Sequence, residues 1–211
     1  HEAIELTEAA RIAGVDACLL VTPYYNKPTQ EGLFLFHKLI ASSVSIPQIL
    51  YNVPGRTACD MSNQTVDRLA SIDGIIGIKD ATGDNQRGRE LIALCEDRIA
   101  IYSGDDPTAA ELILAGAKGD ISVTANIAPK QMADMCNAAS SKDFQLAEKI
   151  DKQIAGLHSA LFIEPNPVLP KWALYKMGLT NSAFLRLPLV ESELASQNHI
   201  EQVMRSSGVL S

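Results

Sequence analysis

Residues 74–81 read GIIGIKDA, an apolar run that ends in a lysine and an aspartate. Four similar runs are CLLVTPYY (18–25), PQILYNVP (47–54), IAIYSGDD (99–106) and GDISVTAN (119–126). They begin 20 to 29 residues apart, and each precedes a helical pattern, a spacing typical of βα units. The runs are largely apolar rather than alternating, as in parallel strands buried on both faces. The sequence therefore predicts a parallel α/β sheet.

Helix signals between these runs support the same architecture. Ser62 and Asp84 precede helical stretches, and Asp106-Pro107 reads as an N-cap followed by proline at the first helical position. Gly116 fits the C-terminal end of that helix, and Pro129 begins another. We therefore expect Asp106 to cap a helix.

Functional side chains cluster at the carboxyl ends of the predicted strands. They are Tyr25, Tyr51, Lys79, Ser103 and Ser122. None of the five strand-to-helix turns has the G-x-G-x-x-G pattern of an open dinucleotide-binding sheet. Barrel enzymes gather their chemistry at the carboxyl ends of the strands. The arrangement therefore favours a (β/α)8 TIM barrel.

Only five of the eight barrel strands are visible. We expect residues 1–141 to form strands 4 to 8 of the barrel with their helices, and the first three βα units to be missing. At about 250 residues per barrel, these units amount to roughly 80–90 residues. Beyond them, residues 142–211 predict a C-terminal helical region, with helices over 143–161, 165–177 and 191–207 and no intervening strand.

Composition narrows the classes of function. The formal net charge of −7 argues against nucleic-acid or anionic-membrane partners, which require clustered basic residues. The four cysteines form no C-x-x-C pair and lack histidines at ligand spacing, so we expect no metal site and a reduced, cytoplasmic setting. No apolar run approaches the roughly 20 residues needed to span a bilayer, and the start shows no signal-peptide pattern.

Lys79 is the main catalytic candidate. Strand alternation places Ile75, Gly77 and Lys79 on one face, with Ile76 and Ile78 on the other. A lysine at a strand end can simply extend its amine to solvent. Alternatively, desolvation in a barrel mouth favours the neutral amine, which can attack a ketone and form a Schiff base. The position of Lys79 alone does not decide between these interpretations.

Tyr51 and Arg56 belong to the motif YNVPGRT at the end of the preceding predicted strand. Neighbouring parallel strands would bring Tyr51 within reach of Lys79, where a phenol can shuttle protons. Core packing is the alternative role for Tyr51. Arg56 follows a Pro-Gly turn, where it can grip a substrate carboxylate or remain solvated. Tyr24 and Tyr25 end an earlier strand, a position typical of interface aromatics.

Six motifs carry a family resemblance: TPYYNKP, ILYNVPGRT, GIKDATG, SGDD, ISVTAN and EPNP, in this order. Together they resemble the dihydrodipicolinate synthase family, within the pyruvate-dependent class I aldolase superfamily, over the whole chain. The resemblance implies a lyase of lysine and diaminopimelate biosynthesis. It would condense pyruvate with L-aspartate-4-semialdehyde and need no metal or organic cofactor.

The resemblance also implies a role for each site residue. Lys79 would form the Schiff base with pyruvate, and Tyr51 would be the central phenol of a proton relay. Tyr25 would enter the relay of a neighbouring subunit. Arg56 would position the carboxylate of the semialdehyde. The backbone around Gly104 and Ile121 would line the pyruvate site.

Assembly and regulation follow from the resemblance in the same way. The family implies a homotetramer built as a dimer of dimers. Lysine, as a feedback inhibitor, would bind at the dimer interface through Glu2 and Tyr24. Asp120 departs from the pattern, because the family normally has an apolar residue there. An unpaired carboxylate is costly to bury, so either Asp120 faces outward or the strand is locally altered.

Two alternatives remain open. A sister enzyme, such as N-acetylneuraminate lyase or a 2-keto-3-deoxy sugar-acid aldolase, would use the same lysine and tyrosine. However, Arg56 favours an acceptor with a carboxylate over a sugar. The second alternative is a non-catalytic barrel subunit, which would have no need to retain Lys79, Tyr51 and Arg56 together.

Overall fold

The computed structural model describes residues 1–210. Its contacts divide the chain into two compact units, His1–Ile121 and Ser122–Ser211. This division lies before residue 141, where the sequence predicts the end of the barrel portion, and that domain boundary stays a prediction.

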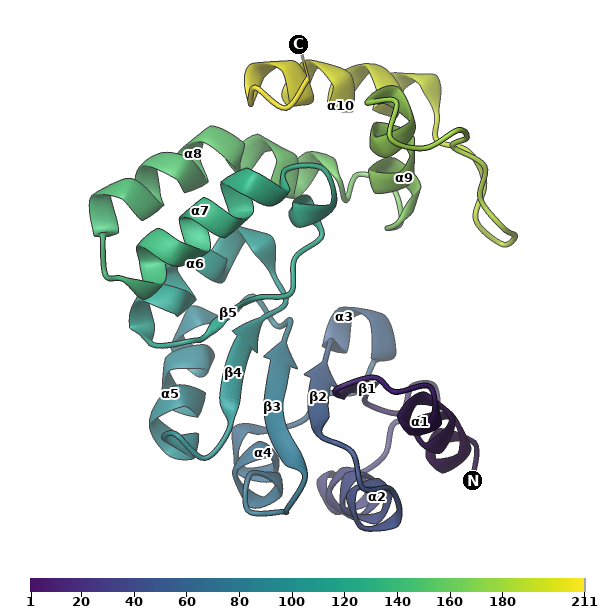
Figure 1. Cartoon of the computed structure of the whole chain (residues 1–211), viewed down its shortest axis with the longest axis vertical. Helices are drawn as coiled ribbons and strands as arrows, with labels where there is room; N and C mark the ends of the chain where they lie inside the picture. Colours follow the sequence, from purple (N-terminus) through teal and green to yellow (C-terminus); the bar gives the residue numbers. More distant parts are fainter. Residues whose placement is uncertain (211) are drawn as a thin grey trace. The chain divides into compact units, whose positions relative to one another are not determined.

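The first unit is a parallel sheet with helices (Figure 1). Its strands are β1 (Cys18–Val21), β2 (Gln48–Asn52), β3 (Ile75–Asp80), β4 (Ala100–Ser103) and β5 (Gly119–Asp120). Its helices are α1 (Glu2–Ile12), α2 (Gln30–Ser43), α3 (Pro54–Thr57), α4 (Asn63–Leu69), α5 (Asn85–Cys95) and α6 (Asp106–Ala115). All five predicted strands are present, although each is shorter than predicted. The strand order is β1-β2-β3-β4-β5, and among the described residues the sheet does not close into a barrel.

A hydrophobic core joins one face of the sheet to its helices. Leu50, Ile78 and Ile101 lie in register on β2, β3 and β4 and are buried. Buried side chains of α2, α4 and α5 complete this core, among them Leu33, Leu69 and Leu91. In-register burial on three neighbouring strands fixes which way the next residue of each strand points, because side chains alternate along a strand.

One part of the predicted alternation in β3 is wrong. The register shifts by one residue between Gln48 and Ile49 of β2, which pair with Ile75 and Gly77. Ile76 lies at this irregularity and is 46% exposed, while Ile75 joins the same core as Ile78. A bulge of this kind breaks the two-residue period. Gly77 and Lys79 lie beyond it, where the pairing is regular again.

The predicted helix signals are largely confirmed. The side chains of Ser62 and Asp84 accept hydrogen bonds from backbone amides in the first turns of α4 and α5. Gly116 ends α6 with a φ of +132°, which favours glycine. The capping role of Asp106 is wrong. Asp105 holds the cap position. Asp106 is the first residue of α6, and its side chain is buried.

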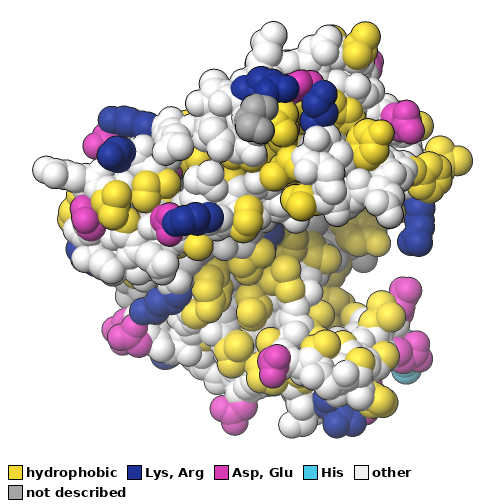
Figure 2. Space-filling view, turned by 45° about the horizontal axis from the view of Figure 1, so that its top comes forward, with side chains coloured by type: hydrophobic (Ala, Val, Ile, Leu, Met, Phe, Trp, Pro, Cys, Tyr) yellow, Lys and Arg dark blue, Asp and Glu magenta, His cyan; other side chains and the backbone are white. Residues whose placement is uncertain are grey.

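Hydrophobic side chains also reach the surface, and Figure 2 shows them gathered in patches on the visible face. Within the first unit, Leu19 and Val21 of the edge strand β1 are exposed, as is Leu6 of α1. A groove of about 480 Å³ runs between α1, β1 and α2 and is lined mainly by apolar residues.

The second unit is helical. It contains η1 (Thr124–Asn126), α7 (Pro129–Ser140), α8 (Phe144–Ala160), α9 (Val168–Lys176) and α10 (Leu194–Ser206). The helices predicted over 143–161, 165–177 and 191–207 are present, whereas residues 124–126, predicted to end the fifth strand, form a short 3-10 helix. Helix α8 packs against α7 and α10, which buries Met135, Ile154 and Ile200. Among residues 1–210, no helix combines the length and apolar character needed to cross a membrane.

Candidate active site

The carboxyl ends of β2 and β3 bring Tyr51 and Lys79 together. These residues are paired in the parallel register, and the Lys79 Nζ lies 4.5 Å from the centroid of the Tyr51 ring. Tyr51 follows the core residue Leu50, and Lys79 follows the core residue Ile78. Because side chains alternate along a strand, both Tyr51 and Lys79 point away from the helix-covered face. The sequence thus places an amine and a phenol side by side on the open face of the sheet.

Gly104 makes room for the lysine on its other side. A Cβ at this position would lie 2.6 Å from Lys79 Cε and 2.9 Å from the Cβ of Ala81. The Gly104 amide also donates a hydrogen bond of 2.8 Å to the Asp80 carbonyl, which fixes the backbone there. The lysine chain therefore occupies a slot bounded by Tyr51 and Gly104.

The surroundings of Lys79 shift its protonation in opposing directions. Partial burial lowers the pKa of the Lys79 amine, while the carboxyl groups of Asp120 and Asp106 oppose this change. The positive charge of Arg56 adds to the lowering. On balance the pKa lies below that of an ordinary lysine, which is what a nucleophilic amine requires.

Tyr51 and Arg56 form the other side of the site. Burial raises the pKa of the Tyr51 phenol, and the nearby Arg56 guanidinium opposes the rise. The phenol therefore keeps its proton near neutral pH and can donate it. Arg56 is exposed in the short helix α3, directly after β2, where its guanidinium is open to an anionic ligand.

The remaining predicted site residues lie as follows. Ile121 follows β5, and its amide donates a hydrogen bond of 2.9 Å to the Ser103 carbonyl. Tyr25 is 93% exposed with a φ of +69°, so its ring projects into solvent rather than packing against Tyr51. Tyr24 is also exposed, as is Glu2 at the start of α1. The structure brings Lys79, Tyr51, Arg56 and Gly104 together.

Asp120 does not face outward, which settles the alternative left open by the sequence. Strand β5 ends at this residue, so regular alternation does not continue through it. Both side-chain oxygens are buried, and the neighbouring carboxyl of Asp106 can share a proton with them. Burial and the Asp106 carboxyl raise the pKa of Asp120 to about 9.

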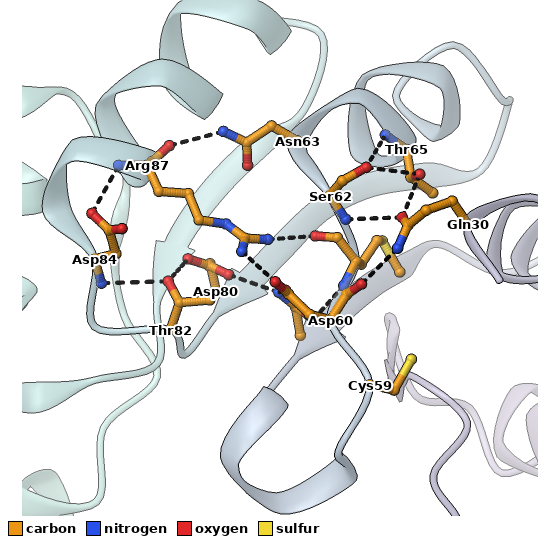
Figure 3. Close-up of polar contacts among 12 residues, drawn as sticks. Gln30, Cys59, Asp60, Ser62, Asn63, Thr65, Asp80, Thr82, Asp84 and Arg87 are labelled. Atoms are coloured by element: carbon orange, nitrogen blue, oxygen red, sulfur yellow. Dashed lines mark hydrogen bonds and ion pairs between the residues drawn. The ribbon is translucent and has the colours of Figure 1, made fainter. Parts of the chain in front are cut away.

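A polar network behind the site was missed by the sequence reasoning (Figure 3). The fully buried Asn52 side chain donates hydrogen bonds to Asp60 (2.9 Å) and Asp80 (3.2 Å). Thr82 donates to the other Asp80 oxygen at 2.6 Å, and Arg87 forms an ion pair of 2.7 Å with Asp60. The network fixes the ends of β2 and β3 just beyond the two candidate catalytic residues.

One signal could have revealed part of this network. Asn52 and Asp80 directly follow Tyr51 and Lys79 and pair in the same register. Two polar residues at matching positions of neighbouring buried strands need one another as partners. Arg87 and Asp60 lie in connecting segments, where no strand period predicts a contact.

Comparison with known proteins gives a consistent result. Residues 1–207 match the model of the dihydrodipicolinate synthetase family. The chain is 57% identical over 209 residues to a 4-hydroxy-tetrahydrodipicolinate synthase of Stutzerimonas stutzeri (strain A1501), covering 99% of this chain and 71% of that protein. It is 58% identical over 210 residues to the enzyme of the same name from Pseudoalteromonas atlantica, covering 100% and 72%.

Solved structures agree with these relatives. The structure of dihydrodipicolinate synthase from Acinetobacter baumannii complexed with pyruvate matches with a TM-score of 0.97 and 54% identity, covering 99% of this chain and 72% of that one. The enzyme from Cyanidioschyzon merolae with lysine bound matches with a TM-score of 0.93 and 31% identity, covering 99% and 71%.

Proposed function

Because the chain belongs to the dihydrodipicolinate synthetase family, we propose that it catalyses the condensation of pyruvate with L-aspartate-4-semialdehyde, a lyase-type step of lysine and diaminopimelate biosynthesis. One observation carries this proposal: the half-buried Lys79 amine lies 4.5 Å from the Tyr51 ring at the carboxyl ends of adjacent strands. The relatives named for this activity and the neighbour complexed with pyruvate support it.

The first chemical step is the formation of an imine on Lys79. The neutral amine attacks the keto carbon of pyruvate, and a C–N bond forms. The carbonyl oxygen leaves as water after taking one proton from the nitrogen and one from a general acid, so that the imine is cationic. The Tyr51 phenol, which keeps its proton near neutral pH, is the group placed to move these protons.

The cationic imine then withdraws electrons from the methyl group of pyruvate. Loss of a methyl proton gives an enamine, whose carbon attacks the aldehyde of the second substrate. The imine itself is the electron sink, so the reaction needs no metal or organic cofactor. Arg56, exposed beside the site, is proposed to bind the carboxylate of the semialdehyde.

We also propose how the site is placed in a complete barrel and in an oligomer. The five parallel strands take the place of strands 4 to 8 in a (β/α)8 barrel, supported by a neighbour of which this chain covers 72%. Assembly into a homotetramer in the cytoplasm is proposed, with exposed Tyr25 reaching a neighbouring subunit. Glu2 and Tyr24 are proposed to bind inhibitory lysine at the dimer interface, by analogy with the lysine-bound neighbour.

A comparison of acceptor aldehydes tests the proposed function. The protein is supplied with pyruvate and either aspartate semialdehyde or aldehydes derived from sugars, and the consumption of pyruvate is followed. We expect turnover with the semialdehyde alone. Turnover only with the sugar-derived aldehydes would instead indicate a sugar-acid aldolase or N-acetylneuraminate lyase.

Tyr51→Phe should lower kcat by about 100- to 10,000-fold, because it removes the proton-transfer group and keeps the ring. Steady-state kinetics measure the effect. Tyr102→Phe is the matched control, since Tyr102 pairs with Lys79 from the other neighbouring strand, β4. Equal losses in the two variants would argue against a specific role for the Tyr51 hydroxyl.

Arg56→Lys should raise KM for the semialdehyde by about tenfold or more, because an ammonium cannot reproduce the two-pronged hydrogen bonding of a guanidinium. Imine formation with saturating pyruvate should be unchanged, since the positive charge beside Lys79 remains. Arg89→Lys, at an exposed ion pair with Glu111, is the control. An unchanged KM in Arg56→Lys would remove Arg56 from the semialdehyde site.

A further inference from the structure

Asp120 brings a second carboxyl group close to the reactive lysine. It lies at the end of β5, next to β4, whose Ser103 pairs with it in register. Gly104 directly follows Ser103. Because Gly104 has no Cβ, the Lys79 side chain can lie close against it. The lysine side chain therefore lies against Gly104 at the end of β4, and Asp120 lies on the next strand, near enough for its charge to act on the amine.

Charged and titratable groups face the lysine side chain from several elements. Tyr51 of β2 lies against it, and Arg56 of α3 contributes a positive charge. On the opposite side, Asp120 of β5 and Asp106 of α6 contribute carboxyl groups, with Asp105 close to Asp120. The Tyr102 ring of β4 packs between Gly77 and Gly119 on the same face.

We propose that Asp120 is the anionic partner of the Lys79 nitrogen and sets the upper part of the pH range over which this amine releases its proton. Two neighbouring carboxyls cannot both ionise easily, so Asp120 and Asp106 share a proton near neutral pH. In alkaline solution Asp120 ionises as well. Its negative charge then faces Lys79 and holds the proton on the amine.

The same pair of carboxyl groups also suits the reaction intermediate. The imine of Lys79 carries a positive charge, and the one negative charge that Asp120 and Asp106 share near neutral pH stabilises it in a partly desolvated site. This part rests on the proposed function, whereas the effect on the free amine does not. Asp120 acts through Lys79, so it is a positioning residue.

Direct titration of Lys79 tests the inference. Protein carrying lysine labelled with ¹³C at Cε is titrated by NMR, and the Lys79 signal is the one missing from Lys79→Arg. In Asp120→Asn and Asp120→Val, we expect the Lys79 midpoint to move to lower pH, because the opposing carboxylate is gone. Asp97→Asn, which removes an equally charged but exposed side chain, should leave the midpoint in place.

The outcomes separate the inference from the proposed function. Lys79 midpoints equal to the wild-type value in both Asp120 variants would overturn the inference, as would loss of the fold in both. If the midpoint shifts and pyruvate is trapped, the alkaline plateau of imine formation should also be reached at lower pH in Asp120→Asn. A shifted midpoint with no trapping in any form of the protein would support the inference and contradict the proposed function.

Discussion

Replacement of Lys79 by alanine should lower the rate of condensation by more than about 1,000-fold, because no other side chain can replace the amine as nucleophile. The substitution removes a charge and an alkyl chain from a partly open slot at the surface of the sheet, so the protein should still fold. Activity is measured with pyruvate and aspartate semialdehyde, and folding by circular dichroism and thermal unfolding.

Two further substitutions sharpen this result. Lys79→Arg keeps a positive charge over the Tyr51 ring but cannot form the imine, so it should be as inactive as the alanine variant. Lys118→Ala removes an exposed lysine that forms an ion pair with Asp97, and it should keep normal activity. Appreciable turnover in Lys79→Arg would show that the lysine acts only through its charge.

Gly104→Ala is expected to lower kcat by roughly 10- to 100-fold while leaving most of the fold intact. The new methyl group would lie 2.6 Å from Lys79 Cε and 2.9 Å from Ala81 Cβ, both closer than van der Waals contact allows. The lysine chain must therefore move, and the backbone at the end of the strand must shift slightly, because the Cβ of Ala81 cannot move by itself. A displacement of about 1 Å at a reacting group can cost this much in rate.

Gly32→Ala is the control for Gly104→Ala. Gly32 lies in α2, where a new Cβ would make only ordinary contacts at 3.4 Å or more. Kinetics and thermal unfolding should be measured for both variants. If Gly104→Ala had wild-type kcat and wild-type yield of trapped imine, the slot between Tyr51 and Gly104 would have no part in positioning Lys79.

The sequence predicted those features that depend on neighbouring residues in one strand. An apolar run ending in GIKD specifies a buried strand with a lysine at its carboxyl end, and YNVPGRT does the same for Tyr51. Parallel pairing of adjacent strands then brings the two residues together, as the register of Tyr51 with Lys79 shows. Helix caps at Ser62 and Asp84 were predictable because their partners lie three residues away.

Features that depend on distant contacts were not predictable. The Arg87–Asp60 contact joins residues of two connecting segments, 27 positions apart. The bulge at Ile76 arises from pairing with β2 and has no signal within β3 itself. Asp106 was expected to cap α6, but tertiary packing buries it beside Asp120 and leaves the cap position to Asp105.

Chemical trapping shows whether Lys79 forms an imine with pyruvate. The protein is incubated with pyruvate and sodium borohydride, digested, and examined by mass spectrometry. We expect a single reduced pyruvate adduct on the peptide containing Lys79, absent without pyruvate and absent in Lys79→Arg. Wild-type protein that carries no adduct, or an adduct on another lysine, would contradict this expectation.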